Sequence, residues 1–195
     1  MTKQRLHTAR SFLTTILLSF VLVACTTIEP PKEVVSGYKY SNTIPLTIGL
    51  VLNDRLRQAK WDKDAAFIVP LGESLSKNSE ALLRKLFTNV VIGNNKTDFN
   101  SGAVDLVVIP TMVSTEMTLP AWSFGKGTFT IFLEWKFLDK NGELIWVDTV
   151  QGYGEGSVWN THGRVKGAID NLFMNSHEAI SNAQEIRDFV KTNSN

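Results

Sequence analysis

Residues 127–153 read GTFTIFLEWKFLDKNGELIWVDTVQGY, and this stretch decides the fold. In its first half, large apolar side chains occupy every second position: Phe129, Ile131, Leu133, Trp135 and Phe137. A period of two predicts a strand with one buried face over 127–138. The Asn-Gly pair at 141–142 tolerates the positive φ of a tight turn. Residues 139–142 are therefore predicted to be a hairpin turn, and 143–153 the returning antiparallel strand.

Two tryptophans and three glycines mark this hairpin. Trp135 and Trp146 each fall within an apolar alternation, so both are expected to face a helix. Gly152, Gly154 and Gly156 lack the spacing of a dinucleotide-binding loop. They predict a frayed, bulged end to the strand.

The rest of the chain supplies shorter strands and two helices. Strands are predicted at 46–52, 67–69, 90–92 and 105–114, a polar connection at 53–66, and helices at 72–87 and 165–190. Gly49, on the face of the first strand opposite Ile48 and Leu50, indicates close approach of another element. The order predicts an α+β fold, with two helices packed on one face of a mostly antiparallel sheet.

The connection before the hairpin, residues 117–126, is unusually apolar for a loop. It contains Leu119, Trp122 and Phe124, shaped by a proline and a glycine. One interpretation is that these side chains fold back and cap the open end of the sheet. The other is an exposed contact loop for an envelope partner or a membrane surface.

The amino terminus has the pattern of a secretory signal peptide. It is basic, with Lys3, Arg5 and Arg10, and continues into an apolar run from Phe12. That run is too short to span a bilayer and ends at Ala24, a small residue directly before Cys25. An ordinary signal peptide with a leftover thiol and an uncleaved anchor are the alternatives.

Leu-Val-Ala-Cys at 22–25 resembles the lipobox of bacterial lipoproteins. The resemblance implies cleavage between Ala24 and Cys25, lipid attached to Cys25, and hence membrane association through that lipid. Thr26, rather than aspartate, resembles the class sorted to the outer membrane, at its periplasmic face. The predicted division is a signal peptide at 1–24, a lipidated cysteine and tether at 25–45, and one domain at 46–195.

The tether prediction comes from prolines, glycine and serines that interrupt any period. Such a segment could hold the domain tens of Å from the lipid, at roughly 3 Å per extended residue.

Composition argues against several functions. The 195 residues contain 20 Lys and Arg against 19 Asp and Glu, without a block of like charge, so no nucleic-acid footprint is expected. Cys25 is the single cysteine, so no disulfide within the chain and no cysteine-based metal site are expected. His162, His177 and Glu134 are the remaining catalytic candidates, and no recognisable catalytic motif joins them. No cofactor, metal or catalytic residue is predicted.

The order of elements over residues 46–190 resembles small periplasmic lipoproteins of envelope machines. These include the lipopolysaccharide-assembly lipoprotein, the α/β core of the curli-secretion lipoprotein, and auxiliary lipoproteins of lipid transporters. The resemblance implies a non-enzymatic structural or interaction subunit of an envelope assembly or transport system, with an envelope protein as partner. The alternative is a small membrane-tethered hydrolase or peptidoglycan-acting enzyme. Lipid binding between sheet and helices is a third possibility.

Overall fold

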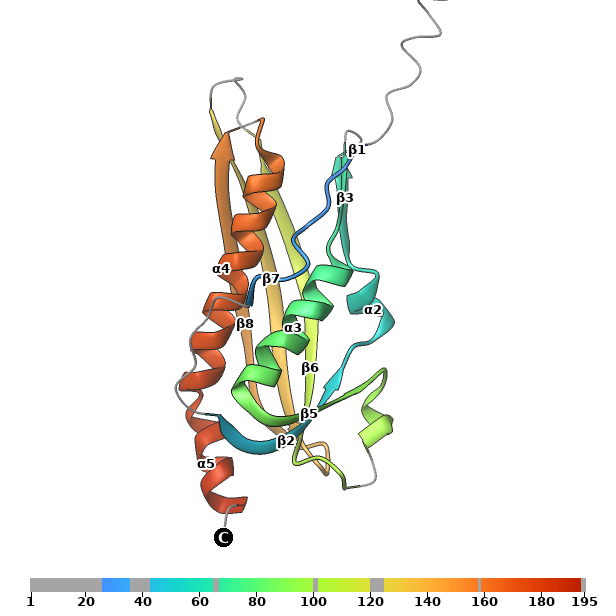
Figure 1. The fold of residues 1–195 in the computed structure, drawn as a ribbon, viewed down its shortest axis with the longest axis vertical. Coiled ribbons are helices and arrows are strands. Elements are labelled where there is room, and N and C mark those ends of the chain that lie inside the picture. Colours follow the sequence, from blue (N-terminus) through green and yellow to red (C-terminus); the bar gives the residue numbers. More distant parts are fainter. Residues whose placement is uncertain are drawn as a thin grey trace, which may run out of the picture.

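The computed structural model describes residues 26–35, 43–64, 67–99, 102–119, 125–157 and 159–193. Within these ranges the chain forms two sheets and several helices (Figure 1). Ala24, Cys25, Trp122 and Phe124, which the sequence analysis singled out, lie outside the described residues.

The elements follow the predicted order closely. They are β1 (Thr26–Thr27), β2 (Ile44–Val51), α2 (Asp54–Arg57), β3 (Lys60–Asp64), β4 (Phe67–Pro70), α3 (Gly72–Leu86), β5 (Phe87–Gly93), the 3-10 helix η2 (Lys96–Phe99), β6 (Leu106–Thr118), β7 (Lys126–Asp139), β8 (Leu144–Ser157), α4 (Thr161–Asn182) and α5 (Gln184–Asn193).

The main sheet has five strands in the order β5-β2-β6-β7-β8. Its longest ladders, β6 with β7 and β7 with β8, are antiparallel, as the hairpin pattern predicts. β2 is parallel to both of its neighbours, so the sheet is mixed. A parallel pairing needs a long crossover, and α3 lies in the connection that leads from β2 to β5.

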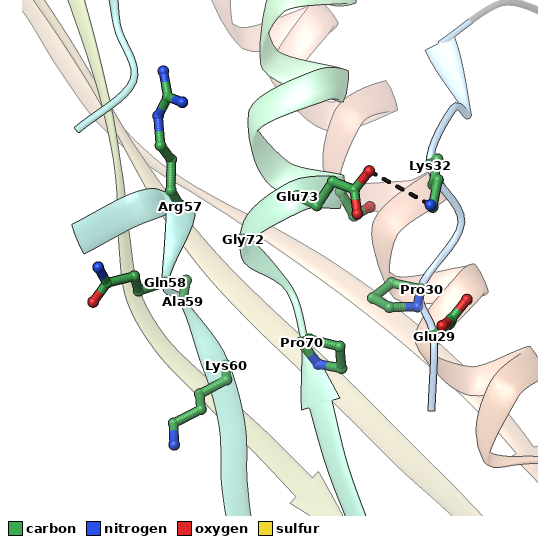
Figure 2. Close-up of a pocket in the computed structure, with 11 residues that line it drawn as sticks. Glu29, Pro30, Lys32, Arg57, Gln58, Ala59, Lys60, Pro70, Gly72 and Glu73 are labelled. Carbon is green, nitrogen blue, oxygen red and sulfur yellow. Dashed lines mark ion pairs between the residues drawn. The ribbon is translucent and has the colours of Figure 1, made fainter. Parts of the chain in front are cut away.

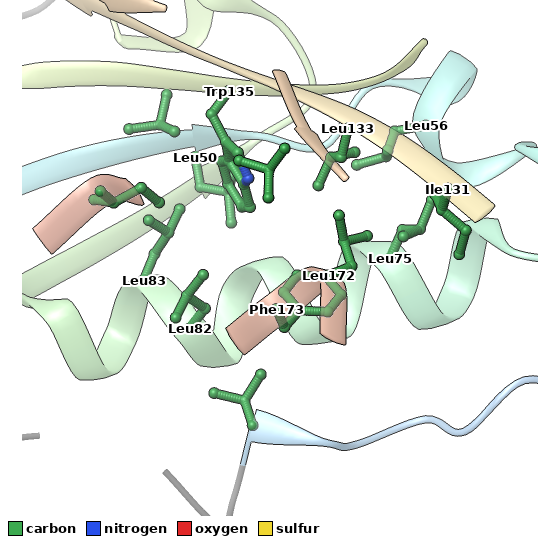
Figure 3. Close-up of a cluster of buried hydrophobic side chains, with 14 of the residues drawn as sticks. Leu50, Leu56, Leu75, Leu82, Leu83, Ile131, Leu133, Trp135, Leu172 and Phe173 are labelled. Atoms are coloured by element: carbon green, nitrogen blue, oxygen red, sulfur yellow. The ribbon is translucent and has the colours of Figure 1, made fainter. Parts of the chain in front are cut away.

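Helices α3 and α4 lie side by side on one face of this sheet (Figure 1). The alternate β7 side chains predicted to be buried are fully buried beneath them. Figure 3 shows Trp135, Leu133 and Ile131 of the sheet facing Leu82 and Leu83 of α3 and Leu172 and Phe173 of α4. Burying such apolar surface is the main favourable contribution to folding. The packing of α3 and α4 on one face of the sheet confirms the predicted α+β fold.

The glycines of β8 have a different role from the predicted one. The strand does not fray or bulge there, because its register with β7 is continuous from Val150 to Ser157. A Cβ atom at Gly152 would collide with the carbonyl oxygen of Ala168, and one at Gly154 with that of Arg164. The glycines therefore leave space for the backbone of α4 to approach the sheet.

Residues 53–66 are not the simple polar connection that their charges suggest. They contain α2 and β3, and β3 pairs with β4, which also pairs with β1, in a second, three-stranded sheet of order β1-β4-β3. Trp61 is buried, with its ring 5.2 Å from Phe67 and 6.2 Å from Phe129. The strand β3 was not predicted from the sequence, because one of its sides is exposed and carries the charged residues that suggested a polar connection.

The predicted carboxy-terminal helix is in fact two helices. α4 begins earlier than expected, where the Asn160 side chain accepts a hydrogen bond from the Gly163 amide at 2.9 Å. It ends at Asn182, and Ala183 leaves the helical conformation, with ψ 112°, before α5 starts. The Arg187 guanidinium of α5 donates to the carbonyl oxygen of Ser181 at 2.6 Å, which satisfies an otherwise open helix end.

Candidate interaction site

Residues 26–35, here called the docked segment, lie against the domain instead of forming a free tether. Thr26 and Thr27 pair with Phe67 and Ile68 of β4, and the Ile28 amide donates to the Ile68 carbonyl at 2.9 Å. Val35, at the other end of the segment, is fully buried in the core. Over these residues the tether prediction is corrected, because the apolar side chains on both sides of the two prolines, Ile28, Val34 and Val35, pack on the domain.

Polar side chains of α3 hold the middle of the docked segment. The buried Asn78 side chain accepts from the Val34 amide at 2.8 Å and donates to the Lys32 carbonyl at 3.3 Å. Ser74 Oγ donates to the Pro31 carbonyl at 2.5 Å, and Lys85 Nζ to the Val35 carbonyl at 2.6 Å. The backbone polar groups of the segment thus find partners on one helix, as buried backbone requires.

A pocket of about 280 Å³ opens between the docked segment, β3 and the start of α3. Figure 2 shows Lys32 reaching Glu73, with 3.5 Å between Nζ and Oε1, and Arg57 and Lys60 on the other side. Hydrogen bonding from Lys77, aided by the charge of Lys32, lowers the pKa of the Glu73 carboxyl. The pocket is thus a solvated charged crevice beside the docked segment, and exposed pairs of this kind add little stability.

The end of the molecule that carries Thr26 is here called the β1 end. The register of the long strands places the end of β6, Lys126 and Ser157 together, and Figure 1 shows this end beside β1. Leu119 is 44% exposed there, and Trp159 is 82% exposed. A hollow of about 620 Å³, lined by Trp61, Lys63 and residues 115–119, joins β3 to the end of β6.

The predicted contact loop is shorter than its sequence suggests, because Met117, Thr118 and Lys126 belong to strands β6 and β7. Met117 is half-buried against the core, and Leu119 is exposed. Lys126 forms an ion pair with Glu155 at 2.6 Å. Of the three apolar residues proposed for contact, only Leu119 lies within the described residues.

A fully buried arginine underlies the β1 end. Arg164, in the first turn of α4, donates from Nη2 to Thr161 Oγ1 at 2.7 Å. A Cβ atom at Gly127 would collide with its guanidinium, and a Cβ at Gly156 would lie 3.1 Å from its Cγ. Burial lowers the pKa of the Arg164 guanidinium. Gly127 and Gly156 were the sequence signal for this contact, but glycines alone do not show which side chain lies against them.

The other face of the five-stranded sheet is here called the outer face. Within the described ranges, no α-helix packs on it. One end is covered by η2, whose Phe99 lies over Gly49, and by Val104. This is the close approach that Gly49 predicts. Farther along, Val147 is 42% and Tyr153 43% exposed, with half-buried Phe132 and the Glu134–Lys136 pair between them in the ladder. On β7 the sequence alternates Thr128, Thr130, Phe132, Glu134 and Lys136 with the buried apolar residues, but that pattern alone does not show how much of the face other elements cover.

The structure does not bring the catalytic candidates together. Glu134 lies on the outer face, whereas α4, which carries both His162 and His177, packs on the opposite face. Fifteen residues separate the two histidines along the helix, or roughly 22 Å at 1.5 Å per residue. Among the side chains that the structure describes, no cluster of three or more His, Cys, Asp or Glu is arranged to hold a metal ion.

Comparison with protein-family models gives no match for this chain, and comparison with curated proteins gives none either. Among solved structures, a DUF330 family protein from Xanthomonas campestris is similar, with a TM-score of 0.58 and 10% identity, over 86% of this chain and 99% of that one. That likeness shows a shared fold.

Two further solved structures are more distant. The PelC dodecamer from Paraburkholderia phytofirmans has a TM-score of 0.46 at 15% identity, over 76% of this chain and 94% of that one. A minor lipoprotein from Acinetobacter baumannii has a TM-score of 0.42 at 12% identity, over 72% and 93%. At these TM-scores neither supports an argument about this chain.

None of the helices in the described part of the chain combines the length and the apolar character needed to cross a bilayer.

Proposed function

We propose that this protein is a bacterial lipoprotein, attached to the membrane by lipid on Cys25, that serves as an interaction subunit of a cell-envelope assembly or transport system. It acts without catalysis, at the periplasmic face of the outer membrane. The observation that carries the proposal is the outer face: a long sheet surface that no α-helix of the described residues covers, in a chain whose amino terminus has the lipobox pattern.

The chemistry of the outer face suits a folded protein partner. Val147, Tyr153 and Phe132 supply apolar and aromatic surface, and Glu134 and Lys136 supply both signs of charge. Protein interfaces combine apolar and aromatic contacts with a polar surround in this way. Because the charges alternate with apolar groups, the face is poorly suited to lying within lipid chains.

The anchor is tested with labelled palmitate. The wild-type chain should incorporate label, and Cys25→Ser should incorporate none and remain as the uncleaved precursor. A wild-type chain that takes up no label, although it is made and exported, would rule out the anchor.

The interaction is tested by placing a photo-crosslinking amino acid at Val147 on the outer face. The matched control is Met174, which is exposed on α4. A discrete crosslinked envelope protein is expected from position 147 and not from 174, and Val147→Glu should weaken complementation of a deletion strain while the chain still folds. Equal crosslinking from both positions would contradict the outer face as the interaction surface.

The catalytic alternative is tested with His162→Ala, His177→Ala and Glu134→Gln. Each variant should complement a deletion strain as well as the wild type does. Loss of complementation by one of these variants, with its melting temperature unchanged, would favour the hydrolase instead.

A further inference from the structure

We infer that the β1 end of the molecule rests directly on the lipid surface, so that the long strands stand upright on the membrane. The inference builds on the proposed lipidation of Cys25. It differs from the tether predicted from sequence, which would let the domain move tens of Å from the bilayer.

The first step concerns the length of free chain. Thr26 follows the lipid-bearing position immediately and is already paired with Phe67 of β4. Consecutive Cα atoms are about 3.8 Å apart. The lipid attachment point therefore lies about one residue from the folded domain.

The second step concerns what keeps Thr26 in place. Behind it, the docked segment makes hydrogen bonds to Ile68 and to Ser74, Asn78 and Lys85 of α3, and it buries Val35. Peeling the segment away would break these bonds together and expose apolar surface. The attachment is therefore part of the fold, and the domain cannot move away from the membrane without partial unfolding.

The third step concerns the surface of the β1 end. Trp159 is the most exposed large apolar side chain among the described residues, and Leu119 is exposed at the same end. Tryptophan favours the boundary between lipid and water, because its ring is apolar and its indole N–H is polar. In water such a side chain is costly, and at a lipid headgroup region it is well accommodated.

The consequence is a defined orientation. The longest axis of the molecule runs from the β1 end to the turn that follows β7 (Figure 1). From Lys126 to Asp139 the strand extends over roughly 40 Å at about 3.3 Å per residue. The turn points away from the membrane. The outer face is then perpendicular to the membrane plane and faces sideways, where a neighbouring envelope protein can reach it.

The orientation is tested with fluorescent probes on the lipidated full chain. Cys25 is the only natural cysteine, and acylation blocks it, so a single introduced cysteine can be labelled. Trp159→Cys and Leu119→Cys report on the β1 end, and Lys140→Cys reports on the distant turn. The labelled proteins are reconstituted in vesicles of phosphatidylethanolamine and phosphatidylglycerol that contain spin-labelled lipid.

The probes at 159 and 119 should lose most of their fluorescence to the spin-labelled lipid, and the probe at 140 should keep its own. Equal quenching at the two ends, or none at 159, would overturn the orientation in a protein that palmitate labelling shows to be acylated. Absence of acylation would instead overturn the anchor and the orientation together, so the two failures are distinguishable.

A second variant tests the short connection. A flexible glycine–serine insertion between Cys25 and Thr26 should reduce the quenching at 159 while palmitate labelling and vesicle binding remain. If quenching at 159 is unchanged by the insertion, then the β1 end binds lipid by itself, and the inference that the short connection holds it there is wrong.

Discussion

At the scale of single residues, Trp135 shows how a buried polar group is satisfied. Its ring is fully buried between β7 and α4, and its indole N–H donates to Ser176 Oγ at 2.9 Å. Trp146 also faces the core side, at the sheet edge, where it is half-buried and packs edge-on against Phe137 with 5.4 Å between ring centres. The alternation of residue types predicts the side on which each ring lies. The hydrogen-bond partner depends on a helix 41 residues away.

Trp135→Ala should destabilise the fold by about 3–5 kcal/mol, because it leaves a cavity and removes the partner of Ser176. Urea denaturation followed by circular dichroism measures the change. Trp159→Ala is the matched control: that residue is exposed, so its replacement should change stability by less than about 0.5 kcal/mol. Similar stabilities for the two variants would contradict the burial of Trp135.

Asp139 links the hairpin turn to pH. Partial burial would raise the pKa of the Asp139 carboxyl, but hydrogen bonds to the carboxylate outweigh this effect and lower the pKa below the usual 3.8. The donors are the backbone amides of Glu143 and Asn141, both at 2.8 Å, and the Asn141 side chain. A lowered pKa in the folded state means that the carboxylate stabilises the fold above its unfolded pKa, and that this contribution is lost as pH falls through the folded pKa.

Asp139→Asn should therefore have a lower melting temperature than the wild type at neutral pH. The difference between the two melting temperatures should become smaller in acid. Thermal melts across that range measure the effect. A gap between the two melting temperatures that stays constant with pH would argue against the role of the carboxylate.

At the scale of elements, the contact between β8 and α4 depends on glycine. Gly154→Ala should be strongly destabilising, because the new Cβ meets backbone atoms of α4 that cannot move without shifting the helix. Gly167→Ala is the control on the other side of the same contact. Its Cβ would lie 3.4 Å from Gly154, and alanine favours a helix by roughly 0.5–1 kcal/mol over glycine. Chemical denaturation should separate the two variants, and equal losses would be evidence against backbone contact.

The docked segment depends on Asn78. Asn78→Ala removes the acceptor for the Val34 amide and the donor to the Lys32 carbonyl, and a buried group left without its partner costs about 1–3 kcal/mol. Hydrogen exchange of the Val34 amide should become faster in this variant. Lys77→Ala, a change at an exposed position one residue earlier, should leave that exchange rate unaltered.

At the scale of the whole molecule, the two sheets share one core. Trp61 and Val69 from the three-stranded sheet belong to the same buried cluster as Phe129 and Ile131 from the five-stranded sheet. A shared core predicts cooperative unfolding without separate steps. The docked segment adds Val35 to that core, so it belongs to the same folding unit.

Unfolding followed by tryptophan fluorescence and by far-ultraviolet circular dichroism should therefore give coincident transitions. Removal of residues 26–35 should lower the denaturation midpoint by both probes equally, because the segment covers α3 and buries Val35. Two separate transitions in the intact chain would show that the sheets fold independently.

Local patterns alone determined much of this protein. Period-two alternation located β7 and β8, the Asn-Gly pair located the turn between them, and a continuous apolar run located β6. A three-to-four residue repeat located α3 within one residue of its end. Each of these signals lies within one element, so neighbouring residues contain it.

Only the tertiary structure decided the rest. The parallel pairing of β2, the strand within residues 60–64, the docking of 26–35 and the exposure of Val147 and Tyr153 on the outer face depend on residues far apart in the chain. A proline-rich segment or a row of glycines has the same local pattern whether it is free or packed. Whether such a segment packs, and against which element, depends on the shape of the surface that the rest of the chain presents to it.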